Sequence, residues 1–317
     1  MRFRVLVNGA SGGGRGKRLF PQIEQKLKAL GISADCSLSH GMAEALTLAK
    51  EAREAGYDFL IAGGGDGTVH QLLPVVVHRP MGLGILPLGT ANDLARSWGI
   101  PLILDDALAL LSRGRPGWVD VIQTDSGAYI GGAAGIGFDV AVVERAEPIR
   151  RHWPRGIWPF LLAMTIEFFR YDLPELAVQG DHWRFEGRAW QVIITKIPRY
   201  ALRVKVLPQT RRDDGRLTVC IVPRISKVKM FFLFPAVFLW GLKILRPAHC
   251  TCGSAVEVRA SRPLPIHGDG ELIGKTPVSF RVVPRGLKVL LPEEGSTGIP
   301  STPLSGRRLS SANQPRQ

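Results

Sequence analysis

Hydrophobic and polar positions in the first 100 residues form two alternating patterns. Segment 17–30 carries apolar residues at helical spacing and segment 42–55 is rich in alanine; each is a predicted helix, and each is followed by a glycine. Short apolar runs of strand length flank these helices, at 2–7, 32–38, 59–62 and 84–86. This order predicts a mostly parallel α/β sheet, whose ligands bind beyond the carboxyl ends of the strands.

The pattern changes near Asp120. Helical periodicity becomes sparse, and short β-rich runs separated by turn residues follow at 129–134, 173–179, 189–195, 202–207, 216–222, 255–260, 278–283 and 287–291. Many short strands of this kind predict an antiparallel sandwich or barrel. We therefore expect an α/β domain over residues 1–120 and a β-rich domain over residues 121–292. Residues 293–317 are rich in Ser, Pro, Gly and Arg, which predicts a disordered tail.

The run at 59–62 ends in three consecutive glycines, and Asp66, Gly67 and Thr68 lead into the next predicted helix. Glycines bring backbone N–H groups close to a ligand, and a helix N-terminus adds partial positive charge, so the loop suits a phosphate. A carboxylate in such a loop is unfavourable unless it faces a metal ion or a proton donor. Asp66 therefore favours a nucleotide phosphate with Mg²⁺ over an ordinary glycine-rich turn.

A second junction of this kind follows the run at 84–86. Residues 87–93 lead into a predicted short helix at 91–99, with Thr90 or Asn92 as its cap and Asp93 in its first turn. A well-capped helix after a turn explains either junction alone. Two such junctions so close together favour a binding site.

Composition narrows the classes of function. The chain has 317 residues, of which 45% are hydrophobic, enough for one large or two ordinary domains. A formal net charge of +14 indicates an acidic partner, which is a nucleotide, a nucleic acid or an anionic membrane. The N-terminus lacks the features of a signal peptide, so a cytoplasmic location is expected. The cysteines are too few and too scattered for a disulfide framework or a zinc site: Cys36, Cys220, Cys250 and Cys252.

The sequence GGDGT at 64–68, followed by PLGTANDLAR at 87–96, resembles the catalytic domain of the diacylglycerol kinase family. This family includes soluble bacterial lipid kinases and the sphingosine and ceramide kinases. GGDGT alone is shared with NAD kinases and more loosely with phosphofructokinases, whereas the second motif is more specific. The resemblance implies an NAD kinase-like or diacylglycerol kinase-like parallel-sheet domain and an antiparallel β-sandwich. It also implies Mg²⁺-dependent transfer of the γ-phosphoryl group of ATP to a lipid hydroxyl. The first expected acceptor is diacylglycerol, whose phosphorylated product is phosphatidic acid.

The resemblance also implies the nucleotide-binding residues. The segment 8–12 is similar to the family's N-P-x-S-G loop, with Gly9 in place of proline, and Ser39 matches a threonine that contacts ATP. His70 and Gln71 stand where the family has Asn or His and then Glu. The implied set is Asn8, Gly9, Ala10, Ser11, Gly12, Ser39, Gly64, Gly65, Asp66, Gly67, Thr68, Val69, His70 and Thr90.

Two magnesium sites are implied as well. One is a Mg²⁺–water network of Asp66, Asp93 and Asp120, although Asp120 also reads as a carboxylate at a hinge. The other is the turn at 208–216, which ends in Asp-Asp-Gly. In bacterial relatives this turn binds a structural Mg²⁺, here through the carboxylate of Asp214 and the backbone carbonyls of Arg211 and Arg216. Asp-Asp-Gly is equally a good hairpin turn.

Two residues are implied in catalysis. Asp-Gly-Glu at 269–271 matches the family motif whose Glu is the proposed general base, so Glu271 would take the hydroxyl proton, while Asp66 would bind Mg²⁺ or assist proton removal. A plain turn between strands also explains this tripeptide. Leu272 replaces the family's proline and Gly268 is atypical. His267 is interpreted as a surface or core histidine, and the glycine-rich strand 131–139 as structural.

Two apolar stretches, 157–169 and 230–242, are flanked by Lys and Arg and are shorter than a membrane span. They are either buried core helices or interfacial helices, and for 230–242 the interfacial interpretation is favoured in an enzyme whose substrate lies in a membrane. The expected partners are ATP and a lipid at an anionic membrane surface, with peripheral attachment and no nucleic acid; a homodimer is left open.

Two other functions remain as alternatives. An NAD kinase shares GGDGT but has no need of the two apolar stretches, and PLGTANDLAR argues against it. A basic nucleic-acid-binding protein would use the net charge of +14 with Lys and Arg interleaved among exposed aromatic residues. The basic regions here are instead uniformly apolar between their charges.

Overall fold

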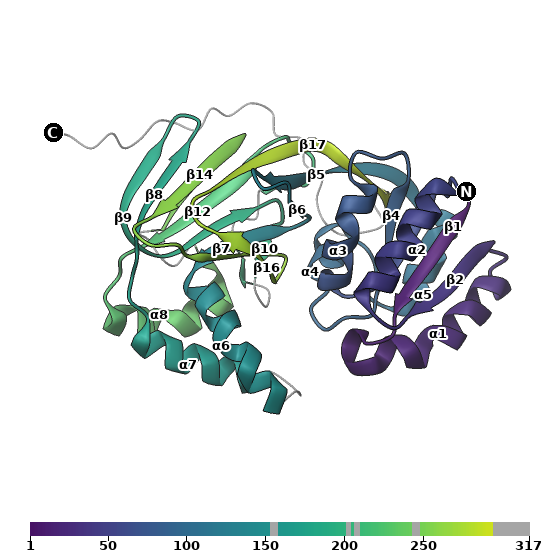
Figure 1. The fold of residues 1–317 in the computed structure, drawn as a ribbon, viewed down its shortest axis with the longest axis horizontal. Helices are drawn as coiled ribbons and strands as arrows, with labels where there is room; N and C mark the ends of the chain where they lie inside the picture. The colour runs from purple at the N-terminus through teal and green to yellow at the C-terminus, as the bar shows by residue number, and fades with distance from the viewer. Residues whose placement is uncertain (153–157, 201–203, 206–209, 243–247, 294–317) are drawn as a thin grey trace.

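The computed structural model describes residues 1–152, 158–200, 204–205, 210–242 and 248–293. The predicted tail lies outside these residues from position 294 on, as does most of the predicted run at 202–207. The chain forms two domains that lie side by side (Figure 1).

The N-terminal domain alternates strand and helix, as the sequence pattern predicts. Its elements are β1 (Phe3–Asn8), α1 (Ser11–Ala29), β2 (Ala34–Ser39), α2 (Met42–Glu54), β3 (Phe59–Gly64), α3 (Asp66–Val76), β4 (Gly82–Pro87), α4 (Asp93–Ser97) and α5 (Leu104–Arg113). The strands pair in parallel in the order β2-β1-β3-β4. Helices cover both faces of this sheet, which is why its strands read as continuous apolar runs. Leu60 and Ala62 pack toward α2 and α3, and Phe59 and Ile61 pack toward α1 and α5.

The remaining elements build the second domain. They are β5 (Arg115–Thr124), β6 (Tyr129–Ile130), β7 (Ala133–Gly137), α6 (Phe138–His152), α7 (Trp158–Arg170), β8 (Glu175–Gly180), β9 (Arg184–Thr195), β10 (Arg199–Tyr200), β11 (Val204–Lys205), β12 (Leu217–Pro223), α8 (Lys227–Trp240), β13 (His249–Gly253), β14 (Ala255–Ala260), β15 (Pro265–Gly268), β16 (Glu271–Lys275) and β17 (Val278–Leu291).

These strands form an antiparallel β-sandwich. One layer has the order β16-β15-β7-β9-β12-β13, and the other contains β8, β14, β17, β5 and β6. β9 belongs to both layers, because residues 184–188 pair with β8 and residues 189–195 pair with β7 or β12. Val192, Val258 and Phe280 lie in the apolar core between the layers. The predicted fold class, a parallel α/β domain followed by an antiparallel sandwich, is confirmed.

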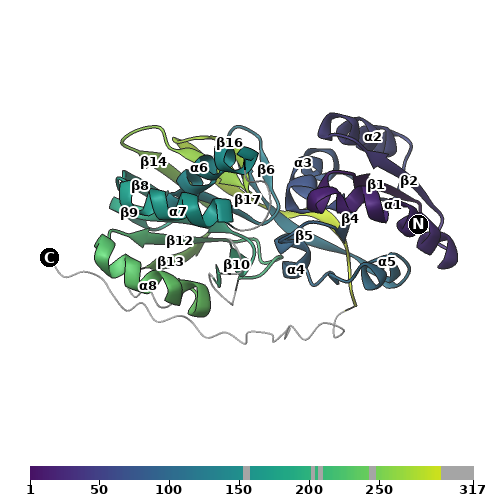
Figure 2. The ribbon, with the colours of Figure 1, turned by 90° about the horizontal axis from the view of Figure 1, so that it is seen from below.

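Three helices cover the outer face of the sandwich (Figure 2). α6 begins directly after β7, within a segment that the sequence analysis interpreted as a single glycine-rich strand. Phe138, its first residue, packs edge-on against Tyr171 and Trp190, so aromatic packing on the sheet stabilises the helix start. α7 and α8 coincide with the two apolar stretches. Among the described helices, none is both long enough and apolar enough to cross a membrane.

The last strand joins the two domains. β17 pairs with β14 and β5 in the sandwich, and its end pairs in parallel with β4 at Val289 and Leu83. Leu290 lies in the core beneath α1 and α5. The two runs predicted at 278–283 and 287–291 are therefore one strand, with an irregularity between Val283 and Leu287. The N-terminal sheet is completed by residues from the far end of the chain.

One disulfide links neighbouring strands of the sandwich. Cys220 in β12 lies opposite Cys250 in β13, and the two sulfur atoms are bonded. No local pattern in the sequence indicates this pair, because strand pairing brings together residues that are 30 positions apart. Cys36 and Cys252 are free thiols.

Candidate active site

The carboxyl ends of β1 and β3 bring two predicted nucleotide loops together. The Asn8 Nδ2 donates a hydrogen bond to the Thr68 Oγ1 at 3.0 Å, and the Ser11 Oγ lies 3.4 Å from the same oxygen. The backbone N–H of Ala10 donates to the Asn8 Oδ1, and that of Gly9 donates to the carbonyl of Ser39. The loop at 8–12, Ser39 and the GGDGT loop thus form one continuous region.

Three predicted nucleotide contacts differ in exposure. The Ser39 side chain is buried, and its hydroxyl donates to the carbonyl of Val7 at 3.4 Å. The Val69 side chain is buried in the core beside α2. Thr90, in contrast, is exposed. A ligand beside these residues therefore meets the Thr90 hydroxyl but does not meet the Val69 side chain.

Glycines let the loops touch through their backbones. A Cβ atom on Gly89 would lie 2.4 Å from the Cα of Gly65, and one on Gly64 would lie 2.4 Å from the Thr68 Oγ1. Gly12 has a φ of +59°, and a Cβ there would lie 2.4 Å from the carbonyl oxygen of Leu88. Only glycine fits such approaches. The first turn of α3, with its N–H groups and partial positive charge, consequently lies at the centre of three packed loops.

The Asp66 side chain binds the backbone of the second motif, residues 87–96. Its Oδ2 accepts the N–H of Asp93 and its Oδ1 accepts the N–H of Leu94, both at 3.0 Å, so this carboxylate caps α4 from another loop. Asn92, one of the two predicted caps, does occupy the N-cap position of α4, but its side-chain amide bonds the backbone of Gly89 and makes no capping hydrogen bond. Burial raises the pKa of Asp66, the two backbone hydrogen bonds oppose this, and the charge of Asp269 adds to it.

Glu271 comes from the sandwich and meets the GGDGT loop. β15 and β16 form a hairpin whose turn residues, Asp269 and Gly270, have φ values of +51° and +92°, as a tight two-residue turn requires. A Cβ on Gly67 would lie 2.8 Å from the Glu271 Oε1, so this carboxylate lies against the first turn of α3. The atypical Gly268 has a structural reason, since a Cβ there would lie 2.8 Å from Ile130. Leu272 is exposed.

Asp269 holds this arrangement in place, and the sequence analysis missed its role. Its carboxylate accepts the N–H groups of Gly131, Gly132 and Ala133 at 2.7–3.1 Å and lies 3.1 Å from the Nδ1 of His70. Burial lowers the pKa of His70, but the hydrogen bond to Asp269 and the charges of Asp269 and Glu271 outweigh it, so the pKa is raised. The Asp-Gly turn is readable in the sequence, whereas its partners on α3 and β7 are not.

Asp120 and Asp214 lie where the two domains meet, and both contact Lys196. The Lys196 Nζ is 2.8 Å from the Asp120 Oδ2 and 2.6 Å from the Asp214 Oδ1, and it donates to the carbonyl of Arg216 at 2.8 Å. The side chain of Arg211 pairs with Asp213. Asp66 and Asp93 are directly linked, whereas the hydrogen bonds of Asp120 go to this other cluster. Within the described part of the chain, no group of three or more His, Cys, Asp or Glu side chains is placed to hold a metal ion.

Two other features belong to packing rather than to the site. The His267 Nε2 lies 2.8 Å from the Asp139 Oδ2, and Asp139 also bonds Gln191, which joins α6 to the sandwich.

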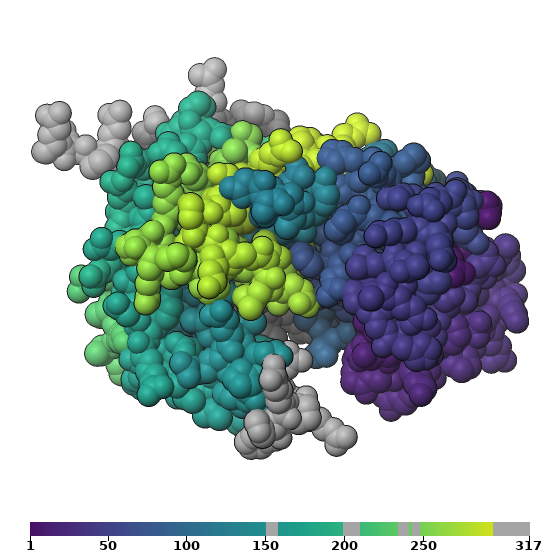
Figure 3. Space-filling model, in the orientation of Figure 1, coloured from purple at the N-terminus to yellow at the C-terminus, as the bar shows by residue number. Residues whose placement is uncertain are grey.

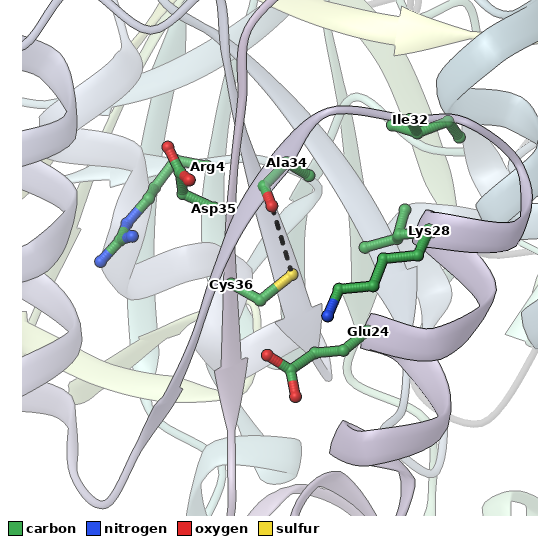
Figure 4. Close-up of a pocket in the computed structure, with 8 residues that line it drawn as sticks. Arg4, Glu24, Lys28, Ile32, Ala34, Asp35 and Cys36 are labelled. Carbon is green, nitrogen blue, oxygen red and sulfur yellow. Dashed lines mark hydrogen bonds between the residues drawn. The ribbon is translucent and has the colours of Figure 1, made fainter.

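A pocket of about 250 Å³ lies between α1 and the edge strand β2 (Figure 4). Burial, followed by the charge of Glu24, raises the pKa of Cys36 in this pocket to about 11, so the thiol stays protonated at neutral pH.

The residues that do come together lie where the domains meet. In Figure 3 the yellow C-terminal residues reach the blue N-terminal domain, and a recess opens below this contact between the two lobes. At the contact between the domains, the Glu271 Oε1 approaches Gly67. A carboxylate from one domain thus faces a phosphate-type loop from the other.

Both domains of the chain resemble known proteins. Residues 2–124 match the family "Diacylglycerol kinase catalytic domain", and residues 132–291 match "YegS C-terminal NAD kinase beta sandwich-like domain". A diacylglycerol kinase of Mycobacterium tuberculosis is 28% identical over 299 residues, covering 92% of this chain and 95% of its own length. One from Staphylococcus saprophyticus is 26% identical over 295 residues, with 92% and 96% covered.

Solved structures show the same fold. A putative diacylglycerol kinase from Bacillus anthracis has a TM-score of 0.76 at 20% identity and covers 92% of this chain and 95% of its own. A second solved structure from that organism, also described as a putative diacylglycerol kinase, has a TM-score of 0.72 at 19% identity and covers 92% of this chain and 96% of its own. The two family matches together span nearly all of the described residues. The chain therefore belongs to the diacylglycerol kinase family and is a lipid kinase.

Proposed function

We propose that this lipid kinase transfers the γ-phosphoryl group of ATP, taken up with Mg²⁺, to the free hydroxyl of diacylglycerol and so forms phosphatidic acid. The observation that carries the proposal is the position of the Glu271 carboxylate against Gly67 at the N-terminus of α3. A hydroxyl that reaches Glu271 is then next to the loop best suited to the phosphates of a nucleotide.

The nucleotide phosphates lie on the loop from Gly63 to Thr68. The N–H groups of the first turn of α3 and its partial positive charge stabilise them, and the hydroxyls of Ser11 and Thr90 border the same space. Each oxygen of Asp66 accepts one backbone N–H and retains acceptor capacity. Asp66 would thus help to hold the Mg²⁺ that accompanies the nucleotide, and the ion would neutralise charge on the phosphates.

The transfer needs positioning and charge neutralisation more than covalent chemistry. The lipid hydroxyl oxygen forms a bond to the γ-phosphorus while the bond from that phosphorus to the β,γ-bridging oxygen breaks, and ADP leaves. The hydroxyl proton passes to the carboxylate of Glu271. Proton transfer of this kind typically contributes about 10²–10⁴-fold to the rate.

The lipid reaches the enzyme at a membrane surface. α7 and α8 are in contact, because Phe168 packs against Phe231 and the Lys227 Nζ donates to the carbonyl of Phe169. Large apolar side chains on both helices, each 46–74% exposed, form an outward apolar surface: Trp158, Leu162, Phe169, Val228, Phe231 and Phe232. We call this the α7–α8 surface. Arg170, Lys227 and Lys229 at its edge are exposed and match anionic headgroups.

The stretch 230–242 combines buried and exposed apolar residues. Met230 is buried in the core beneath α8, and Phe231 and Phe232 are exposed. The side chains of 234–240 lie outside the described ones. In Figure 1, α7 and α8 lie toward the lower side of the molecule, and in Figure 3 the recess opens toward the same side. Attachment through this surface brings the recess toward the lipid.

The test is transfer of labelled γ-phosphate from ATP into detergent-dispersed lipids. The panel contains diacylglycerol, a sphingoid base and an isoprenoid alcohol, with free NAD as a further acceptor. We expect label in diacylglycerol, lowered about 10²–10⁴-fold by Glu271→Gln and strongly by Asp66→Asn. Glu257→Gln is the matched control, because Glu257 lies on β14 and pairs with Arg259. Label in another lipid would replace the proposed acceptor, and label in NAD alone would refute the proposal.

A further inference from the structure

An ammonium group lies among the oxygens that the family resemblance assigns to a structural Mg²⁺. The Lys196 Nζ contacts two of these, the Asp214 carboxylate at 2.6 Å and the Arg216 carbonyl at 2.8 Å. Its third contact is the Asp120 carboxylate at 2.8 Å. The side chains of Lys196 and Asp120 are each 1% exposed. One internal cation therefore already has three oxygen partners in a buried setting.

These residues do not fit a magnesium ion. A divalent cation on the same oxygens would lie against the ammonium of Lys196, with little water to screen two like charges. Moving Lys196 aside would leave a buried ammonium without partners, which is strongly unfavourable. Mg²⁺ also keeps several water ligands in near-octahedral geometry, whereas the side chains of Lys196 and Asp120 are each 1% exposed and that of Asp214 is 31% exposed.

The turn itself adds to the mismatch. Arg211, Arg212 and Arg216 flank the two aspartates, so the surroundings of the carboxylates are already rich in positive charge. Asp120 uses its remaining capacity on backbone N–H groups, those of Gly215 at 2.7 Å and Arg285 at 2.9 Å. The Asp120 and Asp214 carboxylates and the Arg216 carbonyl thus have donors without a metal.

We propose that Lys196 takes the place of the structural metal ion in this protein. Its ammonium joins the end of β9 to β5, through Asp120, and to the turn, through Asp214 and Arg216. The turn continues this link to the N-terminal domain, since the Arg212 side chain donates to the carbonyl of Trp98. The junction between the domains is consequently held by a cation that is part of the chain and that no chelator removes.

The first test uses the unaltered protein without nucleotide. Thermal unfolding is followed by circular dichroism in EDTA and in increasing concentrations of MgCl₂. We expect the same Tm in both. A saturable rise in Tm with Mg²⁺ that disappears in Asp214→Asn would show that the turn binds the metal, and would overturn the proposal.

The second test removes the ammonium. Lys196→Ala opens space among three oxygens that have lost their cation, so we expect a lower Tm in EDTA and a dose-dependent recovery with Mg²⁺. Lys196→Met fills the space with an apolar chain, so we expect a lower Tm without recovery. Lys26→Ala, which removes an exposed pair with Asp105, is the control and should change little.

The outcomes separate clearly. An unchanged Tm in Lys196→Ala would refute a stabilising role for the ammonium, and a lower Tm without recovery in Mg²⁺ would refute its equivalence to the metal. If Lys196→Ala does not fold in EDTA, refolding with and without MgCl₂ gives the same decision. None of these measurements depends on kinase activity, so they stand apart from the proposed reaction.

Discussion

Asp269 shows how one carboxylate can position another that does chemistry. Asp269 lies two positions before Glu271 in the same hairpin. Its carboxylate accepts three backbone N–H groups from residues 131–133 and pairs with His70 on α3. The hairpin is therefore tied both to its own domain and to the nucleotide-binding domain. The charge of His70 affects this tie, because its raised pKa reflects the nearby carboxylates of Asp269 and Glu271.

A pH-dependent contribution to stability follows. A histidine whose pKa is raised on folding stabilises the folded state most when both states are protonated, below its ordinary pKa of about 6.5. The advantage of the wild type over His70→Asn in free energy of unfolding, on the order of 1–2 kcal/mol, should be complete below that pH. It should be lost as the pH rises through the raised pKa of His70. Urea unfolding of both proteins over a series of pH values measures this difference in free energy of unfolding. A difference that grows as the pH rises would contradict the prediction.

At the scale of elements, the nucleotide site depends on backbone contact between loops. Gly65 before α3 and Gly89 before α4 approach closely: a Cβ on Gly89 would lie 2.4 Å from the Cα of Gly65, and one on Gly65 would lie 3.1 Å from the Cα of Gly89. Asp66 then bonds the first N–H groups of α4. The two motifs are therefore one structural unit rather than two neighbouring turns.

Gly89→Ala tests this unit. The added methyl group would lie 2.4 Å from the Cα of Gly65, so the loops must separate, at a cost of about 1–3 kcal/mol in free energy of unfolding. We expect weaker binding of an ATP analogue by calorimetry and a lower Tm. Gly41→Ala is the control, because a Cβ at Gly41 meets no atom within 4 Å. Equal affinity in both variants would show that the contact is not needed for nucleotide binding.

The elements and contacts that the sequence predicted are the local ones. The strands β1 to β4 and the helices α1 and α2 follow from periodicity, and the glycine-rich loops follow from residue type, whereas α5 was not predicted. α6 and the β15–β16 hairpin were not predicted as such, since Phe138 begins a helix only because Tyr171 and Trp190 cover it. Lys196 and Asp269 were missed for a similar reason. Their partners are distant in sequence, and no local pattern indicates that Lys196 meets both Asp120 and Asp214.

At the scale of the whole molecule, charge and apolar surface act together. The chain carries a net charge of +14, and the α7–α8 surface combines exposed aromatic rings with lysines. The double variant Phe231→Ser, Phe232→Ser should lose several-fold in binding to vesicles containing phosphatidylglycerol, because two large apolar side chains no longer enter the interface. Co-sedimentation measures the effect, and wild-type binding should weaken as salt increases.

The control for this prediction is Ile103→Ser, an equally exposed apolar residue on the N-terminal domain, which should bind vesicles as the wild type does. Activity on a short-chain diacylglycerol dispersed in detergent should persist in the double variant. Equal vesicle binding by the double variant and the wild type would place membrane attachment elsewhere on the molecule.

The path of β17 has a consequence for biosynthesis. Val289 and Leu290, among the last described residues, enter the sheet and the core that residues 3–113 begin. A growing chain therefore cannot complete its nucleotide-binding domain until the end of the second domain has left the ribosome, even though that domain is made first. Chains released early retain an open sheet edge and an unfilled core, which proteases and chaperones recognise. Catalytic competence thus appears only after translation has passed the end of β17.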